Sequence, residues 1–176
     1  SEKMLAVAKK ESSHPNIEYR RMDMAEISSL NMKFDLVYSS LAFHYAENFK
    51  KLMEDIFKLL NDFGTLLYSQ EHPINTAPID EDVGHFNLDE NGNKVSYTFS
   101  DYNRSGIRKI HWFGEELTKY HRPMGEILTS IAHSGFVITN VTEPLPKPWA
   151  VEKLPTIVKE YIKPNFLIIK AVKNMF

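Results

Sequence analysis

The chain has 176 residues, of which 43% are apolar and 25% are charged, and its 21 basic and 23 acidic side chains give a net charge of −2. This composition predicts a folded globular protein, and the balanced charge indicates no nucleic-acid partner. The absence of cysteine excludes disulfides, thiolate catalysis and cysteine-ligated metals. We find no secretory signal and no apolar run long enough to cross a membrane, so we expect a cytoplasmic protein.

The first part of the chain predicts alternating helices and strands. Apolar spacing predicts a helix over 1–12, and alternation predicts a short strand over 17–22. The nearly continuous apolar run 34–41 predicts a strand buried on both faces. The clearest helical pattern covers 47–61, and another strand follows over 65–69. This order indicates an α/β domain with a mainly parallel sheet.

The character of the sequence changes between 72 and 121. Prolines interrupt this segment, and Asp-Glu-Asn-Gly-Asn at 89–93 predicts a hairpin turn, because Asn-Gly accepts positive φ angles. The flanking segments 86–88 and 95–99 alternate as strands do. We interpret 72–121 as a cap inserted at the working edge of the sheet. We expect Trp112 and Trp149 to pack in the cap or to line an apolar acceptor pocket.

The remaining third of the chain returns to regular helices and strands. In chain order we predict a helix over 124–133 ended by Gly135, a strand over 136–141, a proline-rich loop, a short helix over 151–162 weakened by Pro155, and a last strand over 166–172.

Several segments, in order, resemble class I S-adenosylmethionine-dependent methyltransferases, of the small-molecule group with a type 11/25-like domain. Tyr-Arg-Arg-Met-Asp-Met at 19–24 is similar to the third strand and its terminal acid. Phe-Asp-Leu-Val-Tyr-Ser-Ser-Leu-Ala-Phe-His-Tyr at 34–45 is similar to the fourth-strand motif. Residues 64–73 resemble the fifth strand and its exit, and 1–8 and 119–123 also resemble this group. The ordered set is more specific than any single motif.

The resemblance implies a Rossmann-like methyltransferase sheet, mainly parallel with an antiparallel last strand, and with an inserted cap that contains a β-hairpin. The glycine-rich cofactor loop of the family is not in this sequence. We therefore expect 1–176 to be a single, N-terminally incomplete methyltransferase domain that lacks its first βαβ unit, with the substrate cap at 72–121 and impaired cofactor binding. Loss of those strands should separate the strand at 17–22 from the rest of the sheet.

The cofactor implied by the resemblance is S-adenosylmethionine. Asp23 would accept a hydrogen bond from the adenine amino group, with Met24 on the adenine face, although a capping aspartate and a core methionine are the plain alternatives. The end of the fourth strand would line the amino-acid part of the cofactor, although small polar residues also simply terminate strands. The implied cofactor-binding residues are Met4, Asp23, Met24, Ser39, Ser40 and Leu41.

Six polar side chains are candidates for catalysis and acceptor binding. His44 and Tyr45 follow a buried strand, where rings tend to face a site, and aromatic faces attract a sulfonium. His72 can act as a general base or be a turn histidine before a proline. Tyr120, His121 and Arg122 can hold an anionic or hydroxylated acceptor, or serve as caps and surface charge. The histidine spacing predicts no metal site.

The sequence therefore predicts an enzyme that transfers a methyl group from S-adenosylmethionine to a small-molecule acceptor. A binding module that kept the fold and lost turnover is the alternative. A nicotinamide-dependent enzyme is disfavoured by the antiparallel last strand. We expect no nucleic-acid or membrane partner, and the prediction allows a homodimer.

Overall fold

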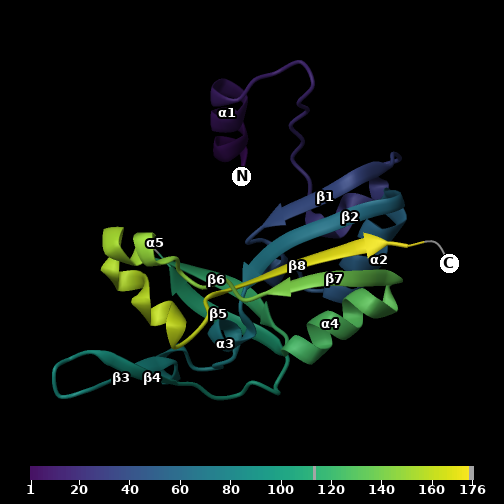
Figure 1. Cartoon of the computed structure of the whole chain (residues 1–176). Helices are drawn as coiled ribbons and strands as arrows, with labels where there is room; N and C mark the ends of the chain where they lie inside the picture. The colour runs from purple at the N-terminus through teal and green to yellow at the C-terminus, as the bar shows by residue number, and fades with distance from the viewer. Residues whose placement is uncertain (113, 175–176) are drawn as a thin grey trace.

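The computed structural model describes residues 1–112 and 114–174, and its centre is a four-stranded sheet with the order β1-β2-β8-β7 (Figure 1). The β1 and β2 strands are parallel, whereas β2–β8 and β8–β7 are antiparallel. The predicted antiparallel last strand is thus confirmed, and a single parallel pair provides the parallel part of the sheet. The strands are β1 (Phe34–Ser40), β2 (Leu60–Glu71), β7 (Phe136–Thr142) and β8 (Phe166–Lys173).

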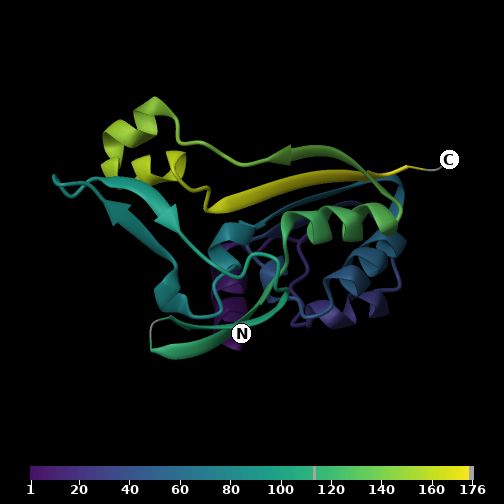
Figure 2. The ribbon, with the colours of Figure 1, turned by 90° about the horizontal axis from the view of Figure 1, so that it is seen from below.

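Two helices, α2 (Phe49–Leu59) and α4 (Met124–His133), cover one face of this sheet (Figure 2). Asn48 caps α2 by accepting a hydrogen bond from the Lys51 backbone N–H at 3.0 Å. Both helices present apolar stripes to the sheet, because their apolar residues recur at helical spacing. The core between these layers includes Met53, Ile56, Leu66, Tyr68, Ile127, Ile131, Leu167, Ile169 and Ala171.

The opposite face of the sheet is open along β1. Leu36 and Tyr38 are 53% and 65% exposed, so the prediction that this strand is buried on both faces is wrong. Within the described part of the chain β1 pairs with β2 alone, and α2 and α4 lie on the other side of the sheet. An apolar run indicates that a strand tends to be buried, but burial of both faces also requires a covering layer on each side of the sheet.

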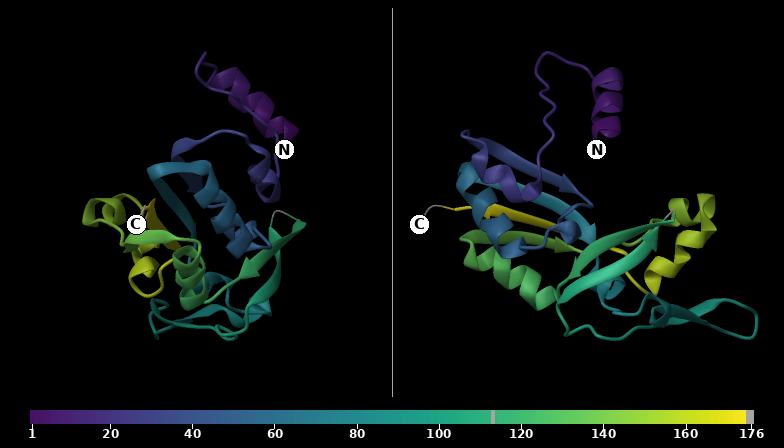
Figure 3. Two further views of the ribbon diagram at one scale, coloured as in Figure 1. Left: turned by 90° about the vertical axis from the view of Figure 1, so that its right-hand side faces the viewer. Right: turned by 180° about the vertical axis from the view of Figure 1, so that it is seen from behind.

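The segment predicted as a strand over 17–22 has no regular structure. A strand requires a neighbour for its backbone hydrogen bonds, and no described segment pairs with this one. This outcome agrees with the expectation that it would be separated from the sheet. Before it, α1 (Glu2–Glu11) has no buried residue and stands apart from the sheet (Figures 1 and 3).

The segment 72–121 forms two antiparallel pairs beside the sheet. The predicted hairpin is confirmed, with Gly92 at φ 81° in its turn. A second ribbon was not predicted, because its sequence alternates only weakly. The elements are α3 (Pro73–Thr76), a 3₁₀ turn at Glu81–Val83, the hairpin β3 (His85–Leu88) and β4 (Lys94–Thr98), and the ribbon β5 (Gly106–Trp112) and β6 (Glu115–His121).

Short helical turns complete the chain. The 3₁₀ turn η1 (Met24–Ser29) precedes β1, and the predicted helix near 151–162 is divided into α5 (Pro148–Lys153) and the 3₁₀ turn η4 (Pro155–Tyr161). The division falls before Pro155, as proline dictates. No helix in the described part of the chain has the length and apolar character needed to span a membrane.

Candidate functional site

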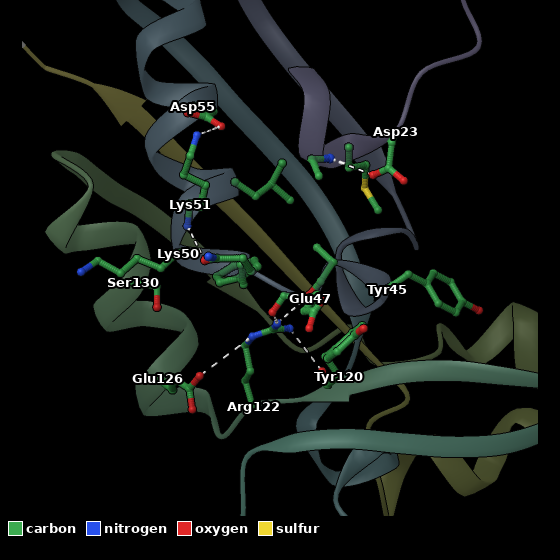
Figure 4. Close-up of a pocket in the computed structure, with 16 residues that line it drawn as sticks. Asp23, Tyr45, Glu47, Lys50, Lys51, Asp55, Tyr120, Arg122, Glu126 and Ser130 are labelled. Carbon is green, nitrogen blue, oxygen red and sulfur yellow. Dashed lines mark hydrogen bonds and ion pairs between the residues drawn. The ribbon is translucent and has the colours of Figure 1, made fainter. Parts of the chain in front are cut away.

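The large cavity, of about 680 Å³, lies between η1, the start of α2 and the junction of β6 with α4 (Figure 4). Its walls come from segments far apart in the sequence. They include five of the predicted site residues: Asp23, Met24, Tyr45, Tyr120 and Arg122.

Asp23 and Met24 occupy the η1 side of the large cavity. Asp23 Oδ1 accepts a hydrogen bond from the Ala25 backbone N–H at 2.9 Å and so caps η1. Asp23 is exposed and Met24 is half-buried. The capping interpretation of Asp23 is therefore correct. Among the described residues no hydrogen bond engages its second carboxylate oxygen, which can accept one from a ligand beside the Met24 thioether.

Arg122 lies at the centre of the large cavity and holds the turn that follows β1 (Figure 4). Its Nη2 atom donates to the backbone oxygens of Ala46 and Glu47 at 2.5 and 2.6 Å. The guanidinium also lies 5.3 Å from the Phe49 ring centroid. Burial lowers the pKa of Arg122. These contacts make Arg122 a positioning residue for the 46–47 turn.

His121 does not join Tyr120 and Arg122 in the large cavity. It is fully buried, with its Nδ1 atom 2.8 Å from Thr76 Oγ1 and its Nε2 atom 2.8 Å from the Tyr102 backbone oxygen. Burial lowers its pKa. The structure thus separates the predicted cluster of three residues, because neighbouring strand residues point to opposite faces.

A second cavity, of about 330 Å³, lies where the ends of β1 and β2 meet the β5–β6 ribbon. Because β1 and β2 are parallel, the residues that follow them meet at the same edge of the sheet. Its lining residues are Leu41, His44, Tyr45, Glu71, Ile110, Trp112, Lys119 and Phe166.

A polar cluster of His44, Glu71 and Lys119 forms one end of the second cavity. Lys119 Nζ donates to Glu71 Oε1 at 2.5 Å, and His44 Nε2 lies 3.7 Å from the same oxygen. His44 Nδ1 accepts the Glu71 backbone N–H at 3.3 Å, so the neutral imidazole carries its proton on Nε2. Burial lowers the pKa of His44, against the opposing charge of Glu71. His44 therefore fixes the backbone at the end of β2, and its ring lies beside the Glu71 carboxylate.

Sequence reasoning did not assign Glu71 and Lys119 to the site. Glu71 ends β2, at the edge where His44 follows β1. That position was the available signal for Glu71. The location of Lys119 depends on the β5–β6 ribbon, which was not predicted.

His72 lies outside both cavities. It is buried, its Nε2 atom lies 2.7 Å from Glu143 Oε1, and its Nδ1 atom accepts the Ile74 backbone N–H at 3.2 Å. Burial lowers its pKa, and the hydrogen bond to Glu143 opposes this effect. These contacts fit the turn-histidine interpretation, because the ring caps α3.

The remaining cofactor candidates are dispersed. Leu41 lines the second cavity with φ 50°, and its N–H donates to the Ser69 backbone oxygen at 2.9 Å. Ser39 and Ser40 line neither cavity. Met4 is 73% exposed on α1 and lines neither cavity. Among the residues that the structure describes, no group of three histidine or acidic side chains is placed to hold a metal.

Comparisons with known proteins identify the family of the chain. The family model described as a methyltransferase domain matches residues 1–68. A crystal structure of an S-adenosylmethionine-dependent methyltransferase from Mesorhizobium loti is 33% identical, with a TM-score of 0.85, and the match covers 98% of this chain and 77% of that one. A structure from Listeria monocytogenes, classed with the same enzymes, is 32% identical, with a TM-score of 0.88, over 99% of this chain and 77% of that one.

A curated protein of Haemophilus influenzae is 36% identical over 112 residues. This match covers 64% of the present chain and 43% of the relative. The chain therefore matches less than half the length of that relative.

Proposed function

The chain belongs to the S-adenosylmethionine-dependent methyltransferases, and from this premise we propose that the whole protein transfers a methyl group from S-adenosylmethionine to a small-molecule acceptor. The observation that carries the proposal is the position of residues 41–47, the turn after β1. Leu41 and His44 of this turn line the second cavity, and Tyr45 lines both cavities. A cofactor on one side and an acceptor on the other would share this wall.

The large cavity fits the adenosine end of the cofactor by the chemistry of its η1 side. The available Asp23 oxygen can accept the hydrogen bond of an amino group, and half-buried Met24 offers an apolar surface to a ring. S-adenosylmethionine supplies an electrophilic methyl group on a sulfonium when bound. Arg122 contributes by fixing the 46–47 turn, and methyl transfer depends strongly on such positioning.

The second cavity supports a small acceptor. Its volume of about 330 Å³ lies within the usual range of small-molecule pockets. Apolar and aromatic side chains line it beside a few polar groups, as is typical of such pockets. A cytoplasmic location and a homodimer stay predictions from the sequence.

Calorimetry with S-adenosylhomocysteine tests the cofactor assignment on the full-length gene product. We expect binding by the wild type and about 10-fold or more weaker binding by Asp23→Ser, because serine keeps the η1 cap but is too short to reach the ligand. Asp80→Ser is the matched control, since Asp80 Oδ1 also caps a 3₁₀ turn through the Asp82 N–H. The absence of binding by the wild type would refute the proposal.

We also propose that residues 1–176 alone bind this ligand weakly. The seven glycines of the chain lie at or after position 64, and none forms a glycine-rich loop after a strand. Such a loop allows close approach of the backbone to a nucleotide. The same calorimetry on the 176-residue chain checks this, and micromolar affinity would contradict it.

A further inference from the structure

We propose that the second cavity selects an amine, and that Glu71 binds the protonated amino group of a compact acceptor with an apolar or aromatic body. This proposal rests on the proposed function, because it treats the second cavity as the acceptor site. It assigns Glu71 as an acceptor-binding residue and names the chemical class of the acceptor. Because an ammonium nitrogen has no lone pair, this group anchors the acceptor, and the methyl group is transferred to another nucleophilic atom of the same molecule.

The first argument is the geometry of the Glu71 carboxylate. Lys119 and His44 approach its Oε1 atom, at 2.5 and 3.7 Å. In the described contacts these partners engage Oε1, which leaves Oε2 as the oxygen for a ligand. The Glu71 side chain is 24% exposed, compared with 10% for the side chain of Lys119. The carboxylate is therefore the more accessible charge of this pair.

The second argument is the charge of the other lining groups. His44 adds no positive charge in this arrangement, because its Nδ1 atom accepts the Glu71 N–H, and burial lowers its pKa in the same sense. Apart from Lys119, the described lining contains no lysine or arginine. Lys119 is paired with Glu71, and Lys163, whose charge also interacts with that of Glu71, is not among the lining residues. An anionic acceptor would therefore meet the Glu71 carboxylate without an unpaired cation in the described lining. An ammonium group would instead form a charge-assisted hydrogen bond to Oε2.

The third argument is the aromatic wall. Tyr45, Trp112 and Phe166 line the cavity and are 37%, 58% and 40% exposed. Leu41 and Ile110 add aliphatic surface. Rings beside a carboxylate favour a cation twice, through cation–π attraction and through ion pairing. The same surfaces can cover an apolar body of the acceptor.

Three probes of one shape test this selectivity: phenethylamine, 2-phenylethanol and 3-phenylpropionate. Ligand-observed NMR titration of the full-length protein would give their dissociation constants. We expect phenethylamine to bind about 10-fold more tightly than 2-phenylethanol, with 3-phenylpropionate weakest. Equal affinities, a preference for the anion, or no binding of any probe would overturn the proposal.

Glu71→Gln then assigns the selectivity to Glu71. Glutamine is isosteric and its amide oxygen can still accept from Lys119. We expect phenethylamine affinity to fall about 10-fold and 2-phenylethanol affinity to stay within about 2-fold. Glu71→Asp should keep the order of the probes. Glu116→Gln is the matched control, because Glu116 pairs with Lys109 at 2.8 Å on the same ribbon, outside the cavity.

Unchanged phenethylamine affinity in Glu71→Gln would overturn the role of Glu71. Calorimetry with S-adenosylhomocysteine on the same samples separates this result from a failure of the proposed function. Glu71→Gln should bind that ligand as the wild type does. If the wild type does not bind it, the methyltransferase proposal fails, whereas the probe affinities still decide the amine proposal.

Discussion

Lys163 shows how burial changes the pKa of a single side chain in this protein. It precedes β8, is 8% exposed and contacts Asn75 Oδ1 through its Nζ atom, which lies 4.5 Å from the Tyr97 ring centroid. Burial lowers its pKa to about 8, from the ordinary lysine value of 10.5. Glu160 opposes the shift, and Lys159 reinforces it.

This shift predicts a pH dependence of stability. Between pH 8 and 10.5 the unfolded chain binds more protons at Lys163 than the folded chain does, so the free energy of unfolding should rise with pH across this window. Below pH 8 both states are protonated, and the full cost of the buried charge remains. Lys163→Met should remove this rise.

Urea unfolding at several pH values between 8 and 10.5 checks the prediction as a difference between wild type and variant. Lys153→Met is the control, because Lys153 is exposed, and it should follow the wild type. Parallel pH profiles for the wild type and Lys163→Met would show that Lys163 is not responsible.

At the same scale, single site residues were partly predictable. Asp23 could be predicted as a candidate because it ends a segment that resembles a motif of the family, and the structure places it in the wall of the large cavity. The sequence could not show that Arg122 and His121 diverge, since that depends on the face to which each side chain points. Glu71 and Lys119 come together only through tertiary contacts between β2 and the β5–β6 ribbon.

The junction of α4 with β7 gives a test at the scale of elements. Gly135 follows α4 with φ 98°, and a Cβ there would lie 2.9 Å from Phe57 Cζ on α2. We expect Gly135→Ala to lower the free energy of unfolding by about 1–3 kcal/mol, because of both backbone strain and the aromatic contact.

Gly125→Ala is the matched substitution in α4. A Cβ at Gly125 meets nothing within 4 Å, and its backbone is not in the left-handed region. This variant should be about 0.5 kcal/mol more stable than the wild type, because glycine costs a helix conformational entropy. Urea denaturation of both variants measures the difference. If both substitutions changed the free energy of unfolding in the same direction, the geometry of the α4–β7 junction would not explain the effect of Gly135→Ala.

Elements with strong local signals were predicted well. The amphipathic pattern of α2, the Asn-Gly turn of the β3–β4 hairpin and the apolar run of β8 each depend on short-range chemistry. The β5–β6 ribbon was missed because its side chains do not alternate clearly in polarity. The segment 17–22 shows the reverse case, since an alternating pattern forms a strand only beside a partner.

At the scale of the whole molecule, one layer of helices covers one face of a mixed sheet, and both cavities border the turn after β1. The covered face could be predicted from the apolar stripes of α2 and α4. The exposure of Leu36 and Tyr38 could not, because it depends on which layers surround β1. The family likeness explains the sheet, and the two cavities suggest how a cofactor and an acceptor would be kept on either side of one turn.

Methyl transfer itself is the most direct test of this account. The full-length protein would be incubated with S-adenosylmethionine labelled in its methyl group and a mixed metabolite extract, and label would be counted in small molecules and in macromolecules. We predict label in the small-molecule fraction, concentrated in amines, and much less with Asp23→Ser. Binding of S-adenosylhomocysteine with no transfer of label would contradict the account and identify a binding module without turnover.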